Sequence, residues 1–303
     1  MTLSLWHEPA RLRRGCALLL LGAITACTTV PALEPRTETL TLTSKDAQLA
    51  AILSLPAGSG PFPAAVLVHG SGRITGDQML SSNGYPLLSM GIAVLAYDKR
   101  GVGGSSGEYT GIGPGNSEKM FDLLATDALA GVEALKTRAD IDPKRVGIFG
   151  VSQAGWIAPL AASRSDHVAF VVLLSGPAVT VGEEIAYSRL AGEDPGSRQG
   201  LSDVEISREF AAFKGPHGFD PAEAIAGMRA PSLWVIGQRD RSLPVPETIA
   251  NLERIKRMNR RAITVHVVPG VNHGLRKPTG QQPDFWSVIR EWFAEHGITK
   301  KGA

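Results

Sequence analysis

The sequence predicts an α/β fold: a doubly wound, mostly parallel sheet, preceded by an antiparallel hairpin and carrying a small helical cap. Short, continuous apolar runs rich in Val, Ile and Leu recur along the chain, as in parallel strands that are buried on both faces. Segments of helical spacing and length separate these runs, and such strand–helix alternation is typical of doubly wound sheets. The first two runs are instead close together and alternate in polarity, which indicates a hairpin.

The expected elements follow in chain order. The hairpin strands are 38–42 and 49–55, and residues 56–63 have the Gly and Pro content of a turn. The later strands are expected at 64–68, 91–97, 146–149, 168–174, 232–236 and 263–268, and the helices at 119–137, 153–163, 246–256 and 283–295.

One connection is much longer than the others. More than fifty residues separate the strands that end at Leu174 and begin at Ser232, with weakly amphipathic stretches at 183–190 and 204–213. Long insertions in compact domains are usually functional. We therefore expect a helical cap at about 177–230 over the carboxyl edge of the sheet; the alternative is a surface excursion without function.

Composition excludes several classes of protein. Of 303 residues, 43% are hydrophobic and 20% are charged, which is ordinary for a globular chain and unlike a disordered one. The formal net charge of +2 gives no reason to expect a nucleic-acid partner.

The N-terminal segment resembles a secretory signal peptide. Arg11, Arg13 and Arg14 precede an uncharged, mainly apolar run, 15–26, which is too short for an ordinary membrane-spanning helix. Both cysteines of the chain, Cys16 and Cys27, lie in this part of the sequence. The rest of the chain therefore has no disulfide framework and no cysteine-based metal site.

The end of the apolar run, Ile-Thr-Ala-Cys at 24–27, resembles the lipobox of bacterial lipoproteins. The resemblance implies that Cys27 is lipidated after cleavage and holds the protein at a membrane surface. We expect a signal peptide and lipobox at 1–27, a tether at 28–36 and the folded domain at 37–303. In such proteins an Asp after the cysteine favours retention at the inner membrane. Residue 28 is Thr, so the outer membrane is favoured, and cleavage with release into the periplasm is the alternative.

A candidate nucleophile follows the strand at 146–149. The segment Gly-Val-Ser-Gln-Ala-Gly at 150–155 joins this strand to a helix, which is the setting of a nucleophile elbow centred on Ser152. The usual pattern is Gly-x-Ser-x-Gly, and Ala154 replaces its last glycine. The helix N-terminus behind Ser152 offers free N–H groups where an oxyanion forms.

A serine needs a histidine base within reach. The chain has seven histidines, and His273 lies in the loop between the last strand and the last helix, at the same edge of the sheet as Ser152. The other six fall in the leader, in turns, next to or within strands, in the cap or late in the last helix: His7, His69, His167, His217, His266 and His296.

The acid of such a triad follows a strand between nucleophile and base. Asp240 fits, because it follows the strand 232–236 and precedes His273. The competing acid is Asp98, which ends a strand before the nucleophile and which we interpret as an ion-pairing or turn residue beside Arg100.

The turn after the first core strand, His-Gly-Ser-Gly at 69–72, is expected to form half of an oxyanion hole. The backbone N–H of Ser71 and that of Gln153 would face the developing negative charge. The alternative is an ordinary glycine turn.

Taken together, the 69–72 turn, Tyr-Asp-Lys-Arg-Gly at 97–101, the 150–155 elbow, Asp240 and His273 resemble the α/β-hydrolase superfamily. The closest likeness is to bacterial esterases of the prolyl-oligopeptidase-like or serine-aminopeptidase-like group, from about residue 37 to the C-terminus. The resemblance implies hydrolysis of small or medium carboxylic esters through an acyl-enzyme without a cofactor. It also implies that the cap shapes the acyl pocket.

Other readings stay open at this level. Peptidase or thioesterase activity on the same triad is the nearest alternative, and a non-catalytic surface lipoprotein is the alternative from another class. Trp156 could line an apolar pocket or simply pack. The glycine-rich stretch 101–107 lacks the spacing of a phosphate loop, and no metal-ligand cluster is evident. The oligomeric state is not predicted.

Overall fold

The computed structural model describes residues 34–192, 198 and 200–300. The predicted signal peptide, the lipidation site Cys27 and the tether up to residue 33 lie outside the described residues. No helix in the described ranges is both long and apolar enough to cross a membrane.

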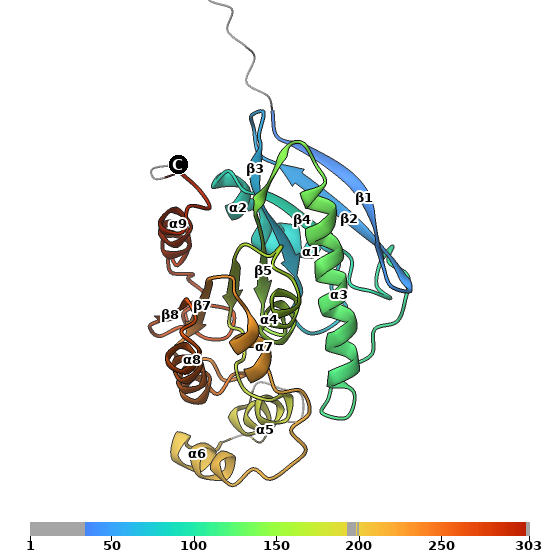
Figure 1. Ribbon diagram of the computed structural model, residues 1–303. Helices are drawn as coiled ribbons and strands as arrows, with labels where there is room; N and C mark the ends of the chain where they lie inside the picture. The colour runs from blue at the N-terminus through green and yellow to red at the C-terminus, as the bar shows by residue number, and fades with distance from the viewer. Residues whose placement is uncertain (1–33, 193–197, 199, 301–303) are drawn as a thin grey trace, which may run out of the picture. The chain divides into compact units, whose positions relative to one another are not determined.

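One sheet of eight strands forms the centre of the described domain, in the order β1-β2-β4-β3-β5-β6-β7-β8 (Figure 1). Its strands are β1 Arg36–Ser44, β2 Ala47–Leu55, β3 Phe62–Val68, β4 Ala93–Tyr97, β5 Ile141–Val151, β6 Val171–Leu174, β7 Ser232–Gly237 and β8 Ile263–Val268. β1 and β2 pair antiparallel, and β2 runs antiparallel to β4. Every other neighbouring pair is parallel. The predicted mostly parallel sheet with an N-terminal antiparallel hairpin is therefore confirmed.

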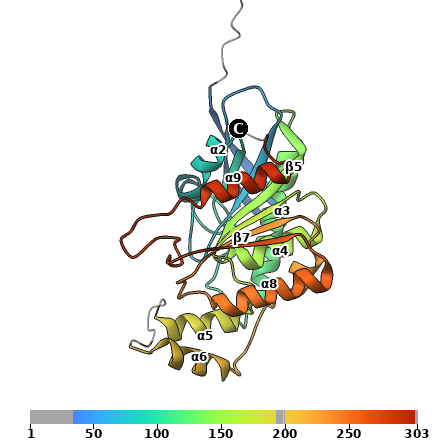
Figure 2. The same cartoon turned by 90° about the vertical axis from the view of Figure 1, so that its left-hand side faces the viewer.

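Helices cover both faces of this sheet (Figures 1 and 2). On one face, α3 Ser117–Lys136, α4 Ala154–Arg164, α7 Ala222–Gly227 and α8 Val245–Asn259 contribute apolar side chains to one buried cluster. On the other face, α1 Gly76–Met79, η1 Leu80–Gly84, α2 Tyr85–Ser89 and α9 Trp286–Glu295 contribute to a second cluster. Because helices pack on both faces, the apolar side chains of the central strands are buried on either side of the sheet.

The long connection between β6 and β7 contains two helices that pair with each other, α5 Val181–Ala191 and α6 Asp203–Ala211. Tyr187 and Phe210 meet edge to face between them, with ring centroids 5.5 Å apart. Each helix begins with a capping box, built by Thr180 on α5 and by Ser202 on α6. In both views the pair lies beyond the end of the sheet (Figures 1 and 2). The third helix of the connection, α7, belongs to the helical layer beside α4 and α8 instead.

The segment between β3 and β4 contains three short helical turns that the sequence analysis did not predict. The middle one, η1, is a π-helix, a form that occurs mostly as single turns and often at functional sites. Pro86 follows at the start of α2. With only four or five residues in each turn, this segment has no helical period long enough to recognise from sequence.

Candidate active site

The structure brings Ser152, His273 and Asp240 together at the carboxyl edge of the sheet. The three residues follow β5, β8 and β7, which run parallel. The His273 Nε2 atom lies 3.0 Å from the Ser152 Oγ atom, and the His273 Nδ1 atom lies 2.8 Å from Asp240 Oδ2. The ring is thus held between the hydroxyl and the carboxylate, as in a nucleophile–base–acid relay.

Ser152 sits on a strained turn. Its φ is 51°, in the left-handed region that non-glycine residues seldom adopt. Neighbours must be small here: a Cβ on Gly150 would lie 2.4 Å from the Ala154 Cβ, and one on Gly155 would lie 2.6 Å from the backbone nitrogen of Pro177. Ala154 therefore fits in place of the usual glycine only because residue 150 has no side chain.

Asp240 is fixed by the backbone of its own loop. Its side chain is fully buried. One oxygen, Oδ1, accepts hydrogen bonds from the backbone N–H groups of Ser242 (2.9 Å) and Leu243 (3.0 Å). The other oxygen is left for the imidazole. Because both oxygens have partners, this buried carboxylate can remain charged and orient the ring.

Ser175, which the sequence analysis missed, fixes the loop that carries the base. Its hydroxyl donates a 2.7 Å hydrogen bond to the His273 backbone carbonyl, and its N–H donates to the Val235 carbonyl. Its φ is also 51°. The available signal was its position at the end of β6, beside the strand that carries Ser152, followed by Gly and Pro.

The 69–72 turn lies against the nucleophile. A Cβ on Gly70 would approach the Ser152 Cβ to 3.4 Å. In the described part of the chain, neither the Ser71 N–H nor the Gln153 N–H donates a hydrogen bond. The Gln153 side chain donates a 3.4 Å hydrogen bond to the Ser71 hydroxyl, so the two residues are adjacent. Two free N–H donors beside a nucleophile can bind an oxyanion.

His69 is a structural residue of this turn. Its Nε2 atom is 2.5 Å from the Tyr97 carbonyl, to which it donates, and its ring meets the Tyr97 ring edge to face. Burial, assisted by the nearby charge of Lys99, lowers the pKa of His69 to about 3. His69 therefore stays neutral at physiological pH and holds the turn to β4.

Asp98 is not part of the relay. Of its two expected roles, the ion pair with Arg100 is wrong, and the role of a turn residue is the one the structure has. The two carboxylate oxygens of Asp98 accept backbone N–H groups from Gly76 (2.7 Å) and Gly104 (2.8 Å), which ties together the loops on either side of β4. Arg100 instead makes two 2.7 Å bonds to Asp127 on α3, and both side chains are buried. A buried guanidinium needs a planar carboxylate partner, and Asp127 provides one.

A pocket of about 330 Å³ opens beside Ser152. Its walls come from the ends of β5 and β6, from η1, and from the segment that follows β8 up to the first residue of α9. They are formed by Ser82, Asn83, Val151, Ser152, Leu174, Ser175, His273, Gly274, Leu275, Arg276, Gln282, Phe285 and Trp286. None of the described cap residues is among them. The unpredicted π-turn supplies one wall.

Trp156 packs rather than lining this pocket. Its indole N–H donates to the Val179 carbonyl at 2.8 Å, and its ring stacks on Phe121. The side chain is buried under the start of the cap connection.

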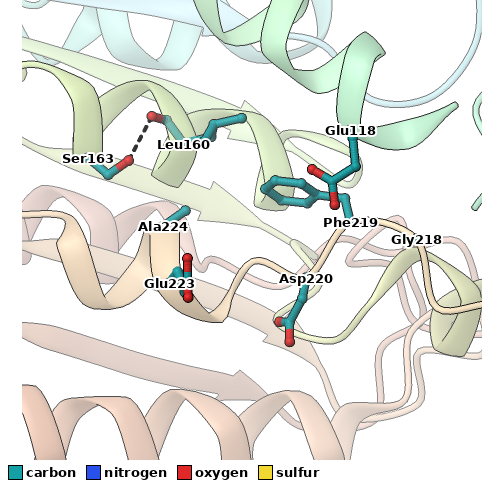
Figure 3. Close-up of a pocket in the computed structure, with 8 residues that line it drawn as sticks. All are labelled: Glu118, Leu160, Ser163, Gly218, Phe219, Asp220, Glu223 and Ala224. Carbon is teal, nitrogen blue, oxygen red and sulfur yellow. Dashed lines mark hydrogen bonds between the residues drawn. The ribbon is translucent and has the colours of Figure 1, made fainter.

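A second, larger hollow of about 490 Å³ lies between α3, α4 and α7 (Figure 3). Glu118, Asp220 and Glu223 face it with exposed carboxylates, and Ser163 in its wall donates to the Leu160 carbonyl. The described residues that line this hollow include no histidine. In the same ranges, no group of three or more His, Cys, Asp or Glu side chains is arranged to hold a metal ion.

The chain is similar in sequence to known enzymes. The model of the prolyl oligopeptidase family matches residues 78–297. Esterase EstD of Thermotoga maritima is 28% identical over 244 residues, which is 73% of this chain and 56% of EstD. Acylamino-acid-releasing enzyme 1 of Oryza sativa is 25% identical over 250 residues, 78% of this chain and 30% of that enzyme. The chain thus spans less than two thirds of either relative's length.

Solved structures agree on the fold. The Pyrococcus furiosus esterase Pf2001 superposes with a TM-score of 0.62 at 21% identity, covering 86% of this chain and 91% of that one. At this identity the likeness shows an α/β-hydrolase fold and nothing finer. The family match covers well over half of the sequence, and it contains all three residues of the hydrogen-bonded relay. The chain therefore belongs to the prolyl oligopeptidase family of serine hydrolases.

Proposed function

We propose that this protein hydrolyses carboxylic esters of small or medium acyl groups through an acyl-enzyme on Ser152. The observation that carries the proposal is the continuous relay from Ser152 through His273 to Asp240, with links of 3.0 and 2.8 Å. EstD is named as an esterase, which supports an ester as the substrate.

In the first half of the reaction, the Ser152 oxygen attacks the ester carbonyl while His273 Nε2 takes the hydroxyl proton. The carbonyl oxygen becomes an oxyanion that the Ser71 and Gln153 N–H groups stabilise; one such donor is typically worth about 3 kcal/mol of barrier. Asp240 keeps the Nδ1 proton of His273 in place and stabilises the imidazolium. The tetrahedral intermediate then collapses, and His273 returns the proton to the leaving alcohol.

In the second half, a water molecule replaces the alcohol. His273 takes its proton, and the resulting hydroxide attacks the acyl carbonyl. Collapse of the second intermediate releases the carboxylic acid, and the proton passes from His273 back to Ser152. No cofactor takes part in either half.

The pocket beside Ser152 favours a compact, largely apolar acyl group. Leu174, Leu275, Phe285 and Trp286 form an apolar wall, and about 330 Å³ accommodates a short or medium chain. Peptide cleavage is the second candidate, because the rice relative is named as an acylamino-acid-releasing enzyme.

The test is hydrolysis of nitrophenyl esters of increasing acyl length beside matched anilides and thioesters. Ser152→Ala should abolish ester cleavage, while the matched serine variant Ser163→Ala, in the wall of the other hollow, should retain it. Cleavage that survives Ser152→Ala would contradict the proposal. Faster turnover of anilides than of esters would favour the peptidase.

We also propose that the protein is exported and held at the cell envelope by lipid on Cys27, with the outer membrane favoured. The charged run at residues 11–14, the apolar run and the Ile-Thr-Ala-Cys sequence support this proposal. Radiolabelled palmitate should be incorporated into the wild type and not into Cys27→Ser. Equal incorporation, or none in the wild type, would contradict the anchor.

A further inference from the structure

Lys99 is the most deeply buried lysine near the site, and the proposed reaction has not used it. It follows β4 and its side chain is inaccessible to solvent. In the described ranges no carboxylate pairs with it; its ammonium donates instead to the carbonyl oxygens of Gly70 (2.6 Å) and Gly72 (2.9 Å). The Tyr109 ring lies 4.3 Å from the ammonium and provides a cation–π contact. A buried ammonium without a carboxylate is rare.

The two carbonyls that bind Lys99 flank the proposed oxyanion donor. The Gly70 carbonyl and the Ser71 N–H belong to one peptide unit. In a trans peptide these groups point in opposite directions, so a cation on the carbonyl side leaves the N–H aimed away from it. A charge bound to the carbonyl also polarises the unit and makes its N–H a stronger donor, as in cooperative hydrogen-bond chains.

The second oxyanion donor is linked to the same ammonium. The Gln153 side-chain oxygen lies 3.4 Å from Lys99 Nζ, and its amide nitrogen donates to the Ser71 hydroxyl. Lys99 therefore contacts the Gln153 side chain directly and the Gly70–Ser71 peptide through the Gly70 carbonyl.

We propose that Lys99 is a positioning residue of the oxyanion hole: its ammonium fixes the 69–72 turn and polarises the Ser71 N–H toward the substrate carbonyl. This inference rests on the proposed ester hydrolysis. Lys99 contacts no substrate atom, and its effect reaches the reaction through the Gly70–Ser71 peptide.

The charge of Lys99 changes within an accessible pH range. Burial lowers its pKa to about 7. The groups that face it are the His69 ring, which stays neutral above pH 3, the Tyr109 ring, the Gln153 amide and the two carbonyls. Since the charged form supports the oxyanion, its contribution is present below the pKa and is lost as pH rises through it.

The experiment compares Lys99→Met and Lys99→Arg with the wild type and with Lys144→Met, an exposed lysine in β5. Removing an oxyanion donor outright lowers kcat about 100- to 1,000-fold. Lys99→Met should therefore lower kcat by about 10- to 100-fold with KM changed less than threefold. The kcat of Lys99→Arg should be at least about tenfold higher than that of Lys99→Met, and the kcat of Lys144→Met should equal that of the wild type.

A transition-state mimic distinguishes a weaker oxyanion hole from a general loss of folded protein. A boronic acid forms a tetrahedral adduct on Ser152 with an oxygen in the oxyanion hole, so its inhibition constant should weaken in Lys99→Met by about the same factor as kcat. Unchanged kcat and boronate affinity in a folded Lys99→Met variant would overturn the proposal. So would a loss confined to KM, or equal kcat in the Met and Arg variants.

The wild type alone provides a further arm if Lys99→Met does not fold. Its kcat should fall at least about fivefold between pH 7 and pH 9.5 with no fall in its thermal midpoint, because the lowered pKa of Lys99 makes its contribution to stability rise with pH over this range. A flat or rising kcat over the same range would overturn the proposal. The proposed function fails separately, through a wild type that cleaves no ester or a Ser152→Ala variant that still does. That result would also remove the basis of the Lys99 proposal.

Discussion

Of the two concave sites, the pocket beside Ser152 is smaller than the hollow between α3, α4 and α7, yet it is the one beside the hydrogen-bonded relay. The hollow is larger, about 490 Å³ against about 330 Å³, and three carboxylates face it. All three are exposed, whereas the single carboxylate of the relay, Asp240, is buried and bound on both oxygens. Volume and charge alone therefore do not identify the site. A carboxylate can take part in catalysis when hydrogen-bond partners hold its oxygens in a fixed orientation.

The backbone differs in the same way. Both Ser152 and Ser175, which line the smaller pocket, have a φ of 51°, while Ser163 in the wall of the hollow lies in regular α4. Strained non-glycine residues persist only where surrounding contacts hold them. The smaller pocket is thus the preorganised one, and three matched pairs of substitutions test this difference.

The largest effect is expected when the same change is made to an acid of each region. Asp240→Asn leaves the loop geometry in place but cannot hold the same imidazole tautomer, and kcat should fall about 10⁴-fold. Asp220→Asn in the hollow should leave kcat within about twofold. Steady-state kinetics on a short nitrophenyl ester measure both. Comparable losses in the two variants would mean that the hollow also serves catalysis.

A smaller effect is expected on substrate choice. Trp286→Ala removes part of the apolar wall beside Ser152, and the ratio of kcat/KM for an octanoate ester to that for a butanoate ester should rise about tenfold. Leu160→Ala in the hollow should not change this ratio. If this ratio changes instead in Leu160→Ala, or in variants of α5 and α6, then the acyl group does not bind in the pocket beside Ser152.

The smallest effect concerns the support of the base. Ser175→Ala deletes one hydrogen bond to the His273 carbonyl, worth about 1 kcal/mol, and should lower kcat about fivefold with the protein still folded. Ser163→Ala deletes a hydroxyl bond to the Leu160 carbonyl and should leave kcat unchanged. The comparison fails if the two serine variants are indistinguishable.

Much of this arrangement could be predicted from sequence, because a parallel sheet brings distant loops to one edge. The order Ser152, Asp240, His273 needed only the strand assignments and the rule that loops at the carboxyl ends meet. The sheet itself followed from the buried apolar runs. Ser71 and Gln153 followed from their places next to a strand end and a helix start.

What could not be predicted depends on contacts between residues far apart in the chain. Asp98 binds the N–H groups of two loops and Arg100 binds α3, and no local pattern distinguishes this from an ion pair between the two. The π-turn η1 is too short for a periodic signal, yet it supplies Ser82 and Asn83 to the pocket. Lys99 likewise gains its environment only when β3 and β4 pair.

Mapping the site of covalent labelling is the most direct test of the relay. The folded protein is treated with a fluorophosphonate, digested and analysed by mass spectrometry, with Asp240→Asn treated in parallel. We expect one phosphonylated residue, Ser152, formed quickly in the wild type and much more slowly in the variant. Labelling at another serine, or labelling of Ser152 at the same rate in both proteins, would contradict activation of Ser152 by His273 and Asp240.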